Sequence, residues 1–349
     1  MNIDDICIAI ADTGKGFSTR WIEYCQEKGI QYRKVNPYSS DLIDKIKGCS
    51  AFMWHHSHGN YKDLLFAKQL LFALEHSGMV VFPSFFSGWH FDDKLGQKYL
   101  MEIFNIKSPK AWVFYDRKSA LNWLRNTSYP KVFKLRGGAG SSNVKLIKSY
   151  QSGKKIISKA FNRGFSSSNS IYSAKTQWTL FKKKKTSFYN VAKYIGLFLF
   201  PTYFKVNLLP KHKGYVYFQE YIPNNGYDIR VIIVGDKAFA IRRNVRKNDF
   251  RASGSGDILY DKTLFDEKLI SHSFDINNYI KSDSLVLDYV LNKDTSEWFL
   301  IEISYGFSAQ GYEMCPGFWT SDMMWHPGFF DSRDWMVQII IDRLLNREE

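Results

Sequence analysis

The sequence has few cysteines and no apolar run long enough to cross a membrane. Its four cysteines form no Cys-x-x-Cys pair, and their spacing matches neither a zinc site nor a disulfide framework. Residues 194–204, the most apolar later stretch, fall well short of the roughly 20 residues that a transmembrane helix needs, and Pro201 interrupts them. The first residues are acidic where a signal peptide would carry lysines. These absences predict a cytoplasmic protein with reduced thiols and no transmembrane segment.

Acidic residues are scarce relative to basic ones, because 34 Asp and Glu stand against 48 Lys and Arg, a formal net charge of +14. Such a surplus favours an anionic partner, and nucleotides, acidic glycans, nucleic acids and anionic lipids all qualify. Hydrophobic residues make up 45% of the chain and charged residues 23%, which is typical of globular rather than disordered proteins. A chain of 349 residues can form about two or three domains with a substantial core.

The first 90 residues alternate short apolar runs with longer amphipathic ones. The apolar runs predict strands at residues 6–11, 31–35, 51–54 and 79–82. The segments between them predict helices at residues 19–28, 40–47 and 62–76, the first of them capped by Ser18. Strands that alternate with helices are typical of a parallel sheet covered on both faces, so we expect an α/β domain at residues 1–90.

Later in the chain, strands come in pairs more often than in alternation with helices. Helices are expected at residues 94–104, 119–125 and 335–345. Strands are expected at residues 131–135, 144–148, 215–221, 228–234, 237–245, 285–291 and 298–303. Gly235-Asp236 is a favoured two-residue hairpin turn between two of them. Residues 154–213 contain a basic insertion that we expect to be partly helical.

A glycine-rich run separates two of these strands and consists of Gly137, Gly138, Ala139, Gly140, Ser141 and Ser142. Glycines let the backbone approach phosphate oxygens closely and direct N–H groups at them. The run is no Walker A loop, because it lacks Gly-Lys-Ser/Thr and strands flank it, so an ordinary hairpin loop is the alternative. Lys134 lies in the apolar strand before it, where an unpaired ammonium is costly to bury. A phosphate oxygen would provide the missing partner.

Several polar residues at strand ends are further candidates. The backbone groups of Glu220, Tyr221 and Ile222, at the end of an expected strand, can bond an adenine edge. Asp228 and Arg230 interrupt an apolar strand, so they either face a polar cleft or form a cross-strand salt bridge. Four arginines lie within residues 242–251. They form either a solvated basic edge or a bidentate clamp for a phosphoryl group or carboxylate: Arg242, Arg243, Arg246 and Arg251.

Two lone carboxylates indicate a metal site. Asp288 and Glu302 each lie inside an apolar strand, and pairing of the two strands would bring their like charges together. A cation between them would relieve the repulsion, and Mg²⁺ bound by carboxylates and phosphate oxygens is the natural occupant. His55, His56 and His58 follow an expected strand end without a nearby acidic ligand, so substrate contacts or plain loop structure are favoured over zinc.

Taken in order, these motifs resemble the ATP-grasp superfamily over residues 91 to 310, and between Asp228 and Arg251 they are similar to its ribosomal-protein glutamate ligase branch. The resemblance implies an α/β domain at residues 1–90 and two lobes with antiparallel sheets, at residues 91–218 and 219–349. ATP would lie between the lobes, with Lys94, Lys134 and the glycine-rich run on its phosphates. Asp228 and the segment 220–222 would complete the nucleotide site.

The resemblance also implies roles around the reacting atoms. Mg²⁺ would be held by Asp288, Glu302 and Ser304, the last at a position where the family usually has Asn. Arg230, Arg243 and Arg251 would be catalytic, stabilising an acyl phosphate and the oxyanion that follows it. The implied enzyme is a carboxylate–amine ligase, which activates a carboxylate with ATP and joins it to an amine. Alternatives are a kinase that phosphorylates a hydroxyl, and an inactive protein that binds a glycan or nucleic acid.

The substrate hypothesis rests on three further observations. The segments 304–307 and 315–319 are similar to a subgroup found in bacterial surface-polysaccharide gene sets. The net charge and the four lysines at 182–185 suit an anionic partner larger than ATP, or contact with anionic lipid. Tryptophans near expected loops can stack on sugar rings: Trp54, Trp89, Trp319 and Trp325. We therefore expect a uronic-acid sugar or glycan and an amine or amino acid as substrates, and no nucleic-acid partner; the oligomeric state is left open.

Overall fold

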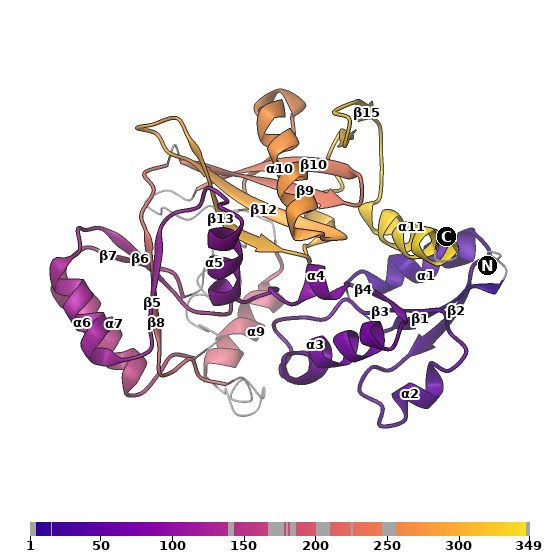
Figure 1. Ribbon diagram of the computed structural model, residues 1–349, viewed down its shortest axis with the longest axis horizontal. Coiled ribbons are helices and arrows are strands. Elements are labelled where there is room, and N and C mark those ends of the chain that lie inside the picture. Colours follow the sequence, from indigo (N-terminus) through magenta and orange to yellow (C-terminus); the bar gives the residue numbers. More distant parts are fainter. Residues whose placement is uncertain are drawn as a thin grey trace.

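The computed structural model describes residues 5–14, 16–138, 143–166, 178, 181, 186–199, 210–224, 226–245 and 256–346. Three sheets organise them: one is parallel and lies in the N-terminal part, and two are antiparallel (Figure 1). This arrangement confirms the expected combination of an α/β domain with antiparallel lobes. Among the described residues, no helix combines the length and apolar character needed to cross a membrane.

The N-terminal sheet has the strand order β2-β1-β3-β4, with all strands parallel, as the alternating pattern predicted. Its strands are β1 (Cys7–Ala11), β2 (Gln31–Val35), β3 (Ala51–Met53) and β4 (Val80–Phe82). The connecting helices are α1 (Ser18–Glu27), α2 (Leu42–Lys45) and α3 (Tyr61–His76). The expected cap at Ser18 is wrong, because the helix already includes Ser18 and its N-cap residue, Phe17, makes no side-chain cap hydrogen bond.

Successive side chains of a strand point to opposite faces of the sheet, so the N-terminal domain has one core on each face. Ile8 and Ile10 of β1 pack against Trp21 of α1, whereas Ala9 faces the side that α2 and α3 cover. The C-terminal helix α11 (Ser332–Leu345) packs beside α1, so both ends of the chain lie at this domain (Figure 1). Arg20 of α1 donates to Asp334 of α11 at 2.6 and 2.7 Å, which fastens the two helices together.

The small antiparallel sheet has the order β5-β8-β6-β7. It is preceded by α4 (Phe85–Gly88) and α5 (Lys94–Ile103), and its strands are β5 (Ala111–Phe114), β6 (Lys131–Lys134), β7 (Lys145–Ile147) and β8 (Val216–Glu220). β6 and β7 form the expected hairpin, and β8 spans the expected lobe boundary at 218. Two helices pack on one face against Phe133 and Phe218, namely α6 (Arg117–Asn126) and α7 (Tyr150–Phe161). The alternate residues Lys134, Tyr217 and Gln219 therefore belong to the other face.

The large antiparallel sheet has the order β13-β12-β9-β10-β14-β15, with β11 paired to β10. Its strands are β9 (Tyr227–Val234), β10 (Lys237–Asn244), β11 (Ile258–Leu259), β12 (Ser284–Leu291), β13 (Trp298–Ser304), β14 (Gly317–Thr320) and β15 (Trp325–Pro327). The hairpin at Gly235 (φ +61°) is confirmed, as is the pairing of β12 with β13. The β14–β15 hairpin and helix α10 (Glu267–Ile280) were not predicted. α10 buries the polar Ser273 and Asn277, which obscures its apolar periodicity.

The large sheet has one face covered by α10 and another shared with the N-terminal domain. Ile229, Val231 and Leu287 pack toward α10. On the opposite face, Ile232 and Val286 join one continuous core with Trp21 of α1 and the apolar side of α11. The large sheet and the N-terminal domain therefore form one packed body. Further along the same face, the apolar residues give way to charged ones, which form the candidate site.

The free edge of β13 is sealed by the segment that leads into the small sheet. The Gln97 amide donates to Ile303 O at 2.8 Å and accepts from Ile303 N at 3.3 Å, as a neighbouring strand would. Leu300 N donates to Lys107 O at 3.0 Å. These bonds satisfy an otherwise open sheet edge and bring α5 and the open face of the small sheet next to the charged part of the large sheet.

Candidate functional site

Charged residues of four neighbouring strands share one face of the large sheet. In the observed register Asp288 lies opposite Arg230 on one side and Glu302 on the other, and Asp228 lies opposite Arg243. Directly paired residues of neighbouring strands point to the same face. The prediction that Asp288 and Glu302 are cross-strand neighbours is therefore confirmed.

Asp288 is buried and held by two arginines. Its two carboxylate oxygens accept hydrogen bonds from Arg230 Nε and Nη2 at 2.6 and 2.7 Å, and Arg243 Nη2 lies 3.1 Å from Oδ2. Burial alone would raise the pKa of Asp288, but the two guanidinium groups hold that pKa well below its usual range. Arg243 also forks onto Asp228 with two bonds of 2.7 Å, yet burial outweighs it and raises the pKa of Asp228.

This network changes the expectation for the carboxylate pair. The positive charge beside Asp288 is supplied by Arg230 and Arg243, whose hydrogen bonds use both of its oxygens. Glu302 instead contacts Lys94, with Oε1 3.0 Å from Nζ, and its side chain is 35% exposed. Among the described residues, no three His, Cys, Asp or Glu side chains form a ready-made metal cluster. Glu302 is thus the carboxylate that fits a Mg²⁺ ion also bound by phosphate oxygens.

Ser304, the third predicted metal ligand, lies two residues beyond Glu302 on β13. Its hydroxyl donates to Gly306 O at 2.8 Å and accepts from Gly306 N at 3.2 Å. This tight turn uses much of the hydrogen-bonding capacity of the hydroxyl. Metal binding by these residues stays a prediction.

The two predicted phosphate lysines are both buried but differ in their partners. Lys94 Nζ contacts Glu302 and donates to Gly138 O at 3.1 Å; burial lowers its pKa, but the nearby carboxylates of Glu302 and Asp92 raise it more. Among the described residues, Lys134 Nζ has only the carbonyl oxygen of Ile301 within reach, at 3.4 Å, and no carboxylate forms an ion pair with it. Burial lowers the pKa of Lys134 to about 8. An ammonium in this position lacks the partner that an anion would supply.

The start of the glycine-rich run is bound to the segment before α5. Gly138 N donates to Asp92 Oδ1 at 2.6 Å, and a Cβ at Gly137 would meet Asp92 Oδ2 at 2.7 Å. Arg136 O accepts from Lys94 N at 2.8 Å, and Arg136 Nε and Nη2 both donate to Asp93 Oδ2. Gly137 must therefore be glycine to permit this approach. Gly140, Ser141 and Ser142 lie outside the described residues, as does Arg251.

The predicted adenine segment connects the two antiparallel sheets. Glu220 ends β8, where its N–H donates to Lys110 O at 2.8 Å and its carboxylate lies 3.7 Å from Lys131 Nζ. Three residues later, Pro223 O accepts from Lys293 N at 2.9 Å. Tyr221 and Ile222 lie between these two anchors, as expected for a hinge, and their contact with adenine stays a prediction.

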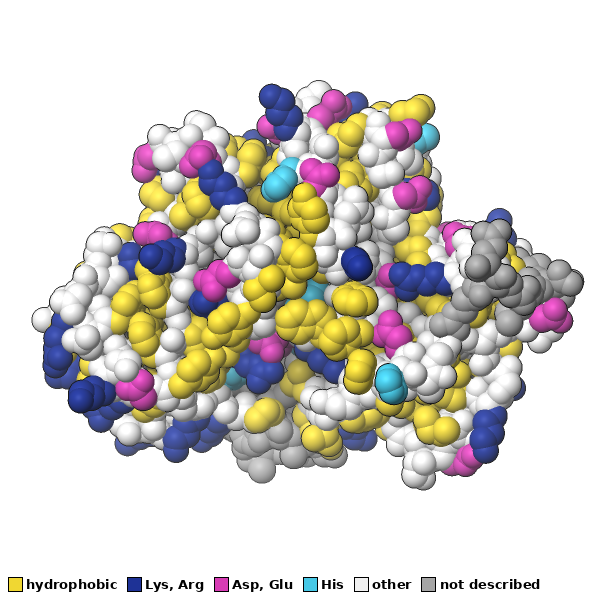
Figure 2. Space-filling view, in the orientation of Figure 1, with side chains coloured by type: hydrophobic (Ala, Val, Ile, Leu, Met, Phe, Trp, Pro, Cys, Tyr) yellow, Lys and Arg dark blue, Asp and Glu magenta, His cyan; other side chains and the backbone are white. Residues whose placement is uncertain are grey.

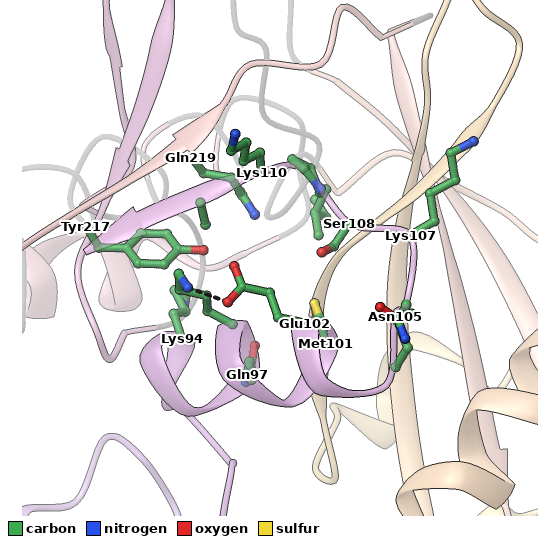
Figure 3. A pocket seen from close by; sticks show the side chains of 15 residues that line it. Lys94, Gln97, Met101, Glu102, Asn105, Lys107, Ser108, Lys110, Tyr217 and Gln219 are labelled. Atoms are coloured by element: carbon green, nitrogen blue, oxygen red, sulfur yellow. Dashed lines mark hydrogen bonds and ion pairs between the residues drawn. The ribbon is translucent and has the colours of Figure 1, made fainter. Parts of the chain in front are cut away.

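A cavity of about 350 Å³ lies between α5 and the open face of the small sheet (Figure 3). Lys94, Gln97 and Met101 line it from α5, Tyr217 and Gln219 from β8. Ile301 of β13 also lines it, and this is the residue whose carbonyl oxygen accepts the bond from Lys134. The volume is within the range typical of small-molecule sites. The two lysines, Glu302 and this cavity therefore belong to one cleft between the sheets.

Two site residues lacked any clear sequence signal. Asp92 has a left-handed backbone (φ +53°) and holds the glycine-rich run, whereas the Tyr312 hydroxyl accepts from Arg230 Nη1 at 3.0 Å. Asp92 stands beside the predicted Lys94, so its position, though not its role, was available from the sequence. Tyr312 comes from a distant loop, and only the tertiary structure brings it to Arg230.

The structure also decides on the histidines and tryptophans. His55 Nδ1 accepts from Phe17 N at 3.1 Å, and burial lowers the pKa of His55 to about 4, so the ring is neutral. His56 packs among aromatic rings. Both histidines therefore stabilise the loop by packing and hydrogen bonding.

The expectation that Trp54 and Trp319 stack on sugars is wrong, because at 0% and 1% exposure they belong to the cores.

Solved structures share this architecture. A RimK-domain ATP-grasp protein from Sphaerobacter thermophilus superposes with a TM-score of 0.56 at 12% identity, over 96% of this chain and 99% of that one. A D-alanine–D-alanine ligase from Bacillus anthracis, complexed with ATP, gives 0.56 at 13% identity over 99% and 98% of the two chains. An N5-carboxyaminoimidazole ribonucleotide synthetase from Thermotoga maritima gives 0.58 at 12% identity over 96% and 75%.

The likeness lies in structure rather than in sequence. No protein-family model matches the sequence, and no curated protein does. At these identities the likeness establishes the fold alone. The chain has the ATP-grasp fold, which confirms the fold that the sequence resemblance implied.

Proposed function

We propose that this protein is an ATP-dependent carboxylate–amine ligase that acts through an acyl phosphate. The observation that carries the proposal is Lys134, a buried ammonium with no described carboxylate partner, in the same cleft as Lys94 and Glu302. A polyphosphate would complete the coordination of Lys134 and compensate its lost hydration. The ligases of known structure with this fold support the same interpretation, one of them complexed with ATP.

In this proposal the small sheet binds the nucleotide. Lys134 and Lys94 would contact phosphate oxygens, and the first turn of the glycine-rich run would cover them, because Asp92 holds Gly138 in place. The base would lie toward the segment 220–222 and the cavity beside Gln219. Glu302 would hold Mg²⁺, which supplies neutralising charge to the transferring phosphoryl group.

The large sheet would supply the group that stabilises the reacting carboxylate. Arg243 uses Nε and Nη2 on Asp228 and Asp288, and no described residue accepts a hydrogen bond from its Nη1. Arg230 donates hydrogen bonds from Nε and Nη2 to Asp288 and from Nη1 to Tyr312. We therefore assign Arg243 to the developing oxyanion and Arg230 to positioning Asp288, which keeps the arginine network fixed. Arg251 stays a candidate for the same role.

For the substrates, we propose a uronic-acid sugar or glycan as the carboxylate and an amino acid or small amine as the acceptor. The similarity of segments 304–307 and 315–319 to a polysaccharide-associated subgroup supports this choice. Trp89 and Trp325 are the two predicted tryptophans that are not fully buried. They stay candidates for contact with sugar rings.

The test is to incubate the protein with MgATP, uronic acids and a pool of amines, and to measure ADP, phosphate and product mass. A product lighter by one water than acid plus amine, formed with stoichiometric ADP, is the expected result. ADP release only with peptide acids would overturn the sugar assignment but keep the ligase. Phosphorylation of a hydroxyl without any need for an amine would overturn the ligase in favour of a kinase. No ATP turnover with any acid would indicate a binding protein.

A further inference from the structure

Basic residues are concentrated in one part of the chain. Residues 111–220, which include the small sheet, contain 21 of the 48 Lys and Arg but only two of the 34 acidic residues. Their formal net charge is +19, whereas the rest of the chain has a net charge of −5. The overall surplus of +14 therefore belongs entirely to residues 111–220, which we call the small-sheet lobe. A nucleotide in the cleft can engage Lys94 and Lys134 but leaves the outer surface of this lobe without a counter-charge.

Most of the outer cations that the structure describes in this lobe have no described acidic partner. Among the described residues, the following exposed ones form no ion pair: Arg117, Lys118, Arg125, Lys145, Lys148, Lys154, Lys155, Lys159, Arg163, Lys211 and Lys213. The two acids of the lobe are engaged elsewhere, since Asp116 caps α6 and Glu220 lies near Lys131. Figure 2 shows dark blue side chains along the lower left margin, over α6 and α7. This surface attracts anions over an extended area.

Two of these cations even share one aromatic ring. Lys145 and Lys159 place their Nζ atoms 5.9 and 4.7 Å from the centroid of Phe165. Burial and the charge of Lys159 together lower the pKa of Lys145. The two like charges repel each other, so anions near them would be stabilising.

The same lobe also exposes apolar side chains on a helix. In α9 (Phe188–Leu199), Phe188, Tyr189 and Ile195 are 63%, 74% and 44% exposed, while Val191 is buried. The spacing of Phe188 and Ile195 places them on one side of the helix. Trp178, on the chain before α9, is 46% exposed. Exposed aromatic and aliphatic residues of this kind on a basic lobe are typical of helices that lie in a membrane interface.

We infer that the small-sheet lobe docks on the surface of an anionic lipid bilayer, with the exposed side of α9 at the headgroup boundary and the cations of α7 over the headgroups. A polyanion such as a nucleic acid or acidic glycan would accept the cations but leave Phe188 and Ile195 in water. A bilayer takes both kinds of side chain, which is why it fits better. The docking is independent of the proposed reaction, because it uses none of the cleft residues.

The test is flotation of the full-length protein with vesicles. The protein should float with phosphatidylcholine vesicles that contain about 30% phosphatidylglycerol and stay behind with phosphatidylcholine alone. Lys154→Glu/Lys155→Glu should weaken binding at least about 25-fold, since each basic residue near the surface contributes roughly fivefold. The separate variant Phe188→Ser/Ile195→Ser should also weaken vesicle binding, although its net charge equals that of the wild type. Matched controls are Lys28→Glu/Lys34→Glu on the N-terminal domain and Phe329→Ser, an 83% exposed side chain outside the lobe.

The outcomes separate lipid from other anions. Loss of vesicle binding in both lobe variants, with the controls unchanged and all circular-dichroism spectra superimposable, is the expected result. Binding to neither vesicle overturns the proposal. If Phe188→Ser/Ile195→Ser floats like the wild type while Lys154→Glu/Lys155→Glu loses binding to both vesicles and heparin, the surface recognises a polyanion and not a bilayer. ADP release measured in parallel should be the same for every variant, because none lies in the cleft.

Discussion

The two antiparallel sheets form opposite walls of one cleft, yet they differ in whether their buried charges are neutralised within the protein. On the large sheet, Asp288 is neutralised within the protein by Arg230 and Arg243, at 2.6 to 3.1 Å. On the small sheet, Lys134 is buried as well and has a single described partner, a carbonyl oxygen at 3.4 Å. A satisfied charge network gives a wall of fixed shape, whereas an unsatisfied charge has free energy to gain from a ligand. The difference predicts that Asp288 and its two arginines serve as scaffold, whereas Lys134 is available to an anionic ligand.

The largest expected effect is on the satisfied wall. Asp288→Ala leaves two buried guanidinium groups without their shared carboxylate, so we expect the free energy of unfolding to fall by about 3–5 kcal/mol. Urea denaturation measures this directly. Asp275→Ala, at an exposed position of α10, is the control and should change it by less than about 0.5 kcal/mol. A loss below about 1 kcal/mol for Asp288→Ala would contradict the scaffold role and favour a carboxylate that serves a metal only.

Glu302 lies opposite Asp288 in the strand register, and its substitution should affect activity more than stability. Glu302→Gln removes one carboxylate from the buried Lys94, which keeps Asp92 nearby, so stability should fall by about 1–3 kcal/mol, less than for Asp288→Ala. ADP release should nevertheless fall about 100-fold or more, since a bound cation supplies several kcal/mol of charge stabilisation. The measurement is the rate against Mg²⁺ concentration, with Glu297→Gln as the exposed control. A near-normal rate at saturating Mg²⁺ would remove Glu302 from the metal site.

Lys134→Met sharpens the contrast, because stability and affinity should move in opposite directions. Removing a buried ammonium whose single described partner is a carbonyl oxygen at 3.4 Å should raise the melting temperature of the ligand-free protein. The same change should weaken ATP binding by about 1.5–3 kcal/mol, the value of a hydrogen bond to a charged group. Scanning calorimetry and titration calorimetry measure the two effects. Equal ATP affinity in both proteins would show that Lys134 contacts no phosphate, and a lower melting temperature would show that its charge is already satisfied.

The smallest expected effect is a pH dependence. The pKa of Lys134 is lowered to about 8, below the value of an unfolded lysine, so the folded protein loses this proton before the unfolded chain does. Its contribution to stability therefore rises with pH from about 8 until the unfolded lysine titrates. ATP should bind the protonated form, so its affinity should fall about tenfold per pH unit above 8. Titration calorimetry across about pH 7 to 9.5 tests this. Lys134→Arg should abolish the dependence, and an unchanged slope in that variant would assign it to another group.

Much of the site follows from local sequence. A lysine in the apolar run of β6, two acids in the runs of β12 and β13, and a glycine-rich turn before β7 each break a strand pattern. Such breaks are costly unless something compensates them, so the amino-acid pattern alone marks these positions as candidates for a functional site. The order of these breaks along the chain was enough to indicate the fold.

The partners of those residues came only from the tertiary structure. Arg230 and Asp288 are 58 positions apart, and the strand register that pairs them depends on the loops and on α10, whose buried Ser273 and Asn277 hide it from periodicity. Trp54 and Trp319 were expected near loops, within reach of a sugar, but they are core residues, because elements that are distant in sequence cover them. Periodicity fixes which face a side chain occupies. Periodicity does not fix which residues pack against that face, because those residues are distant in sequence. Long-range packing therefore decides whether a charge is neutralised by the protein or left for a ligand.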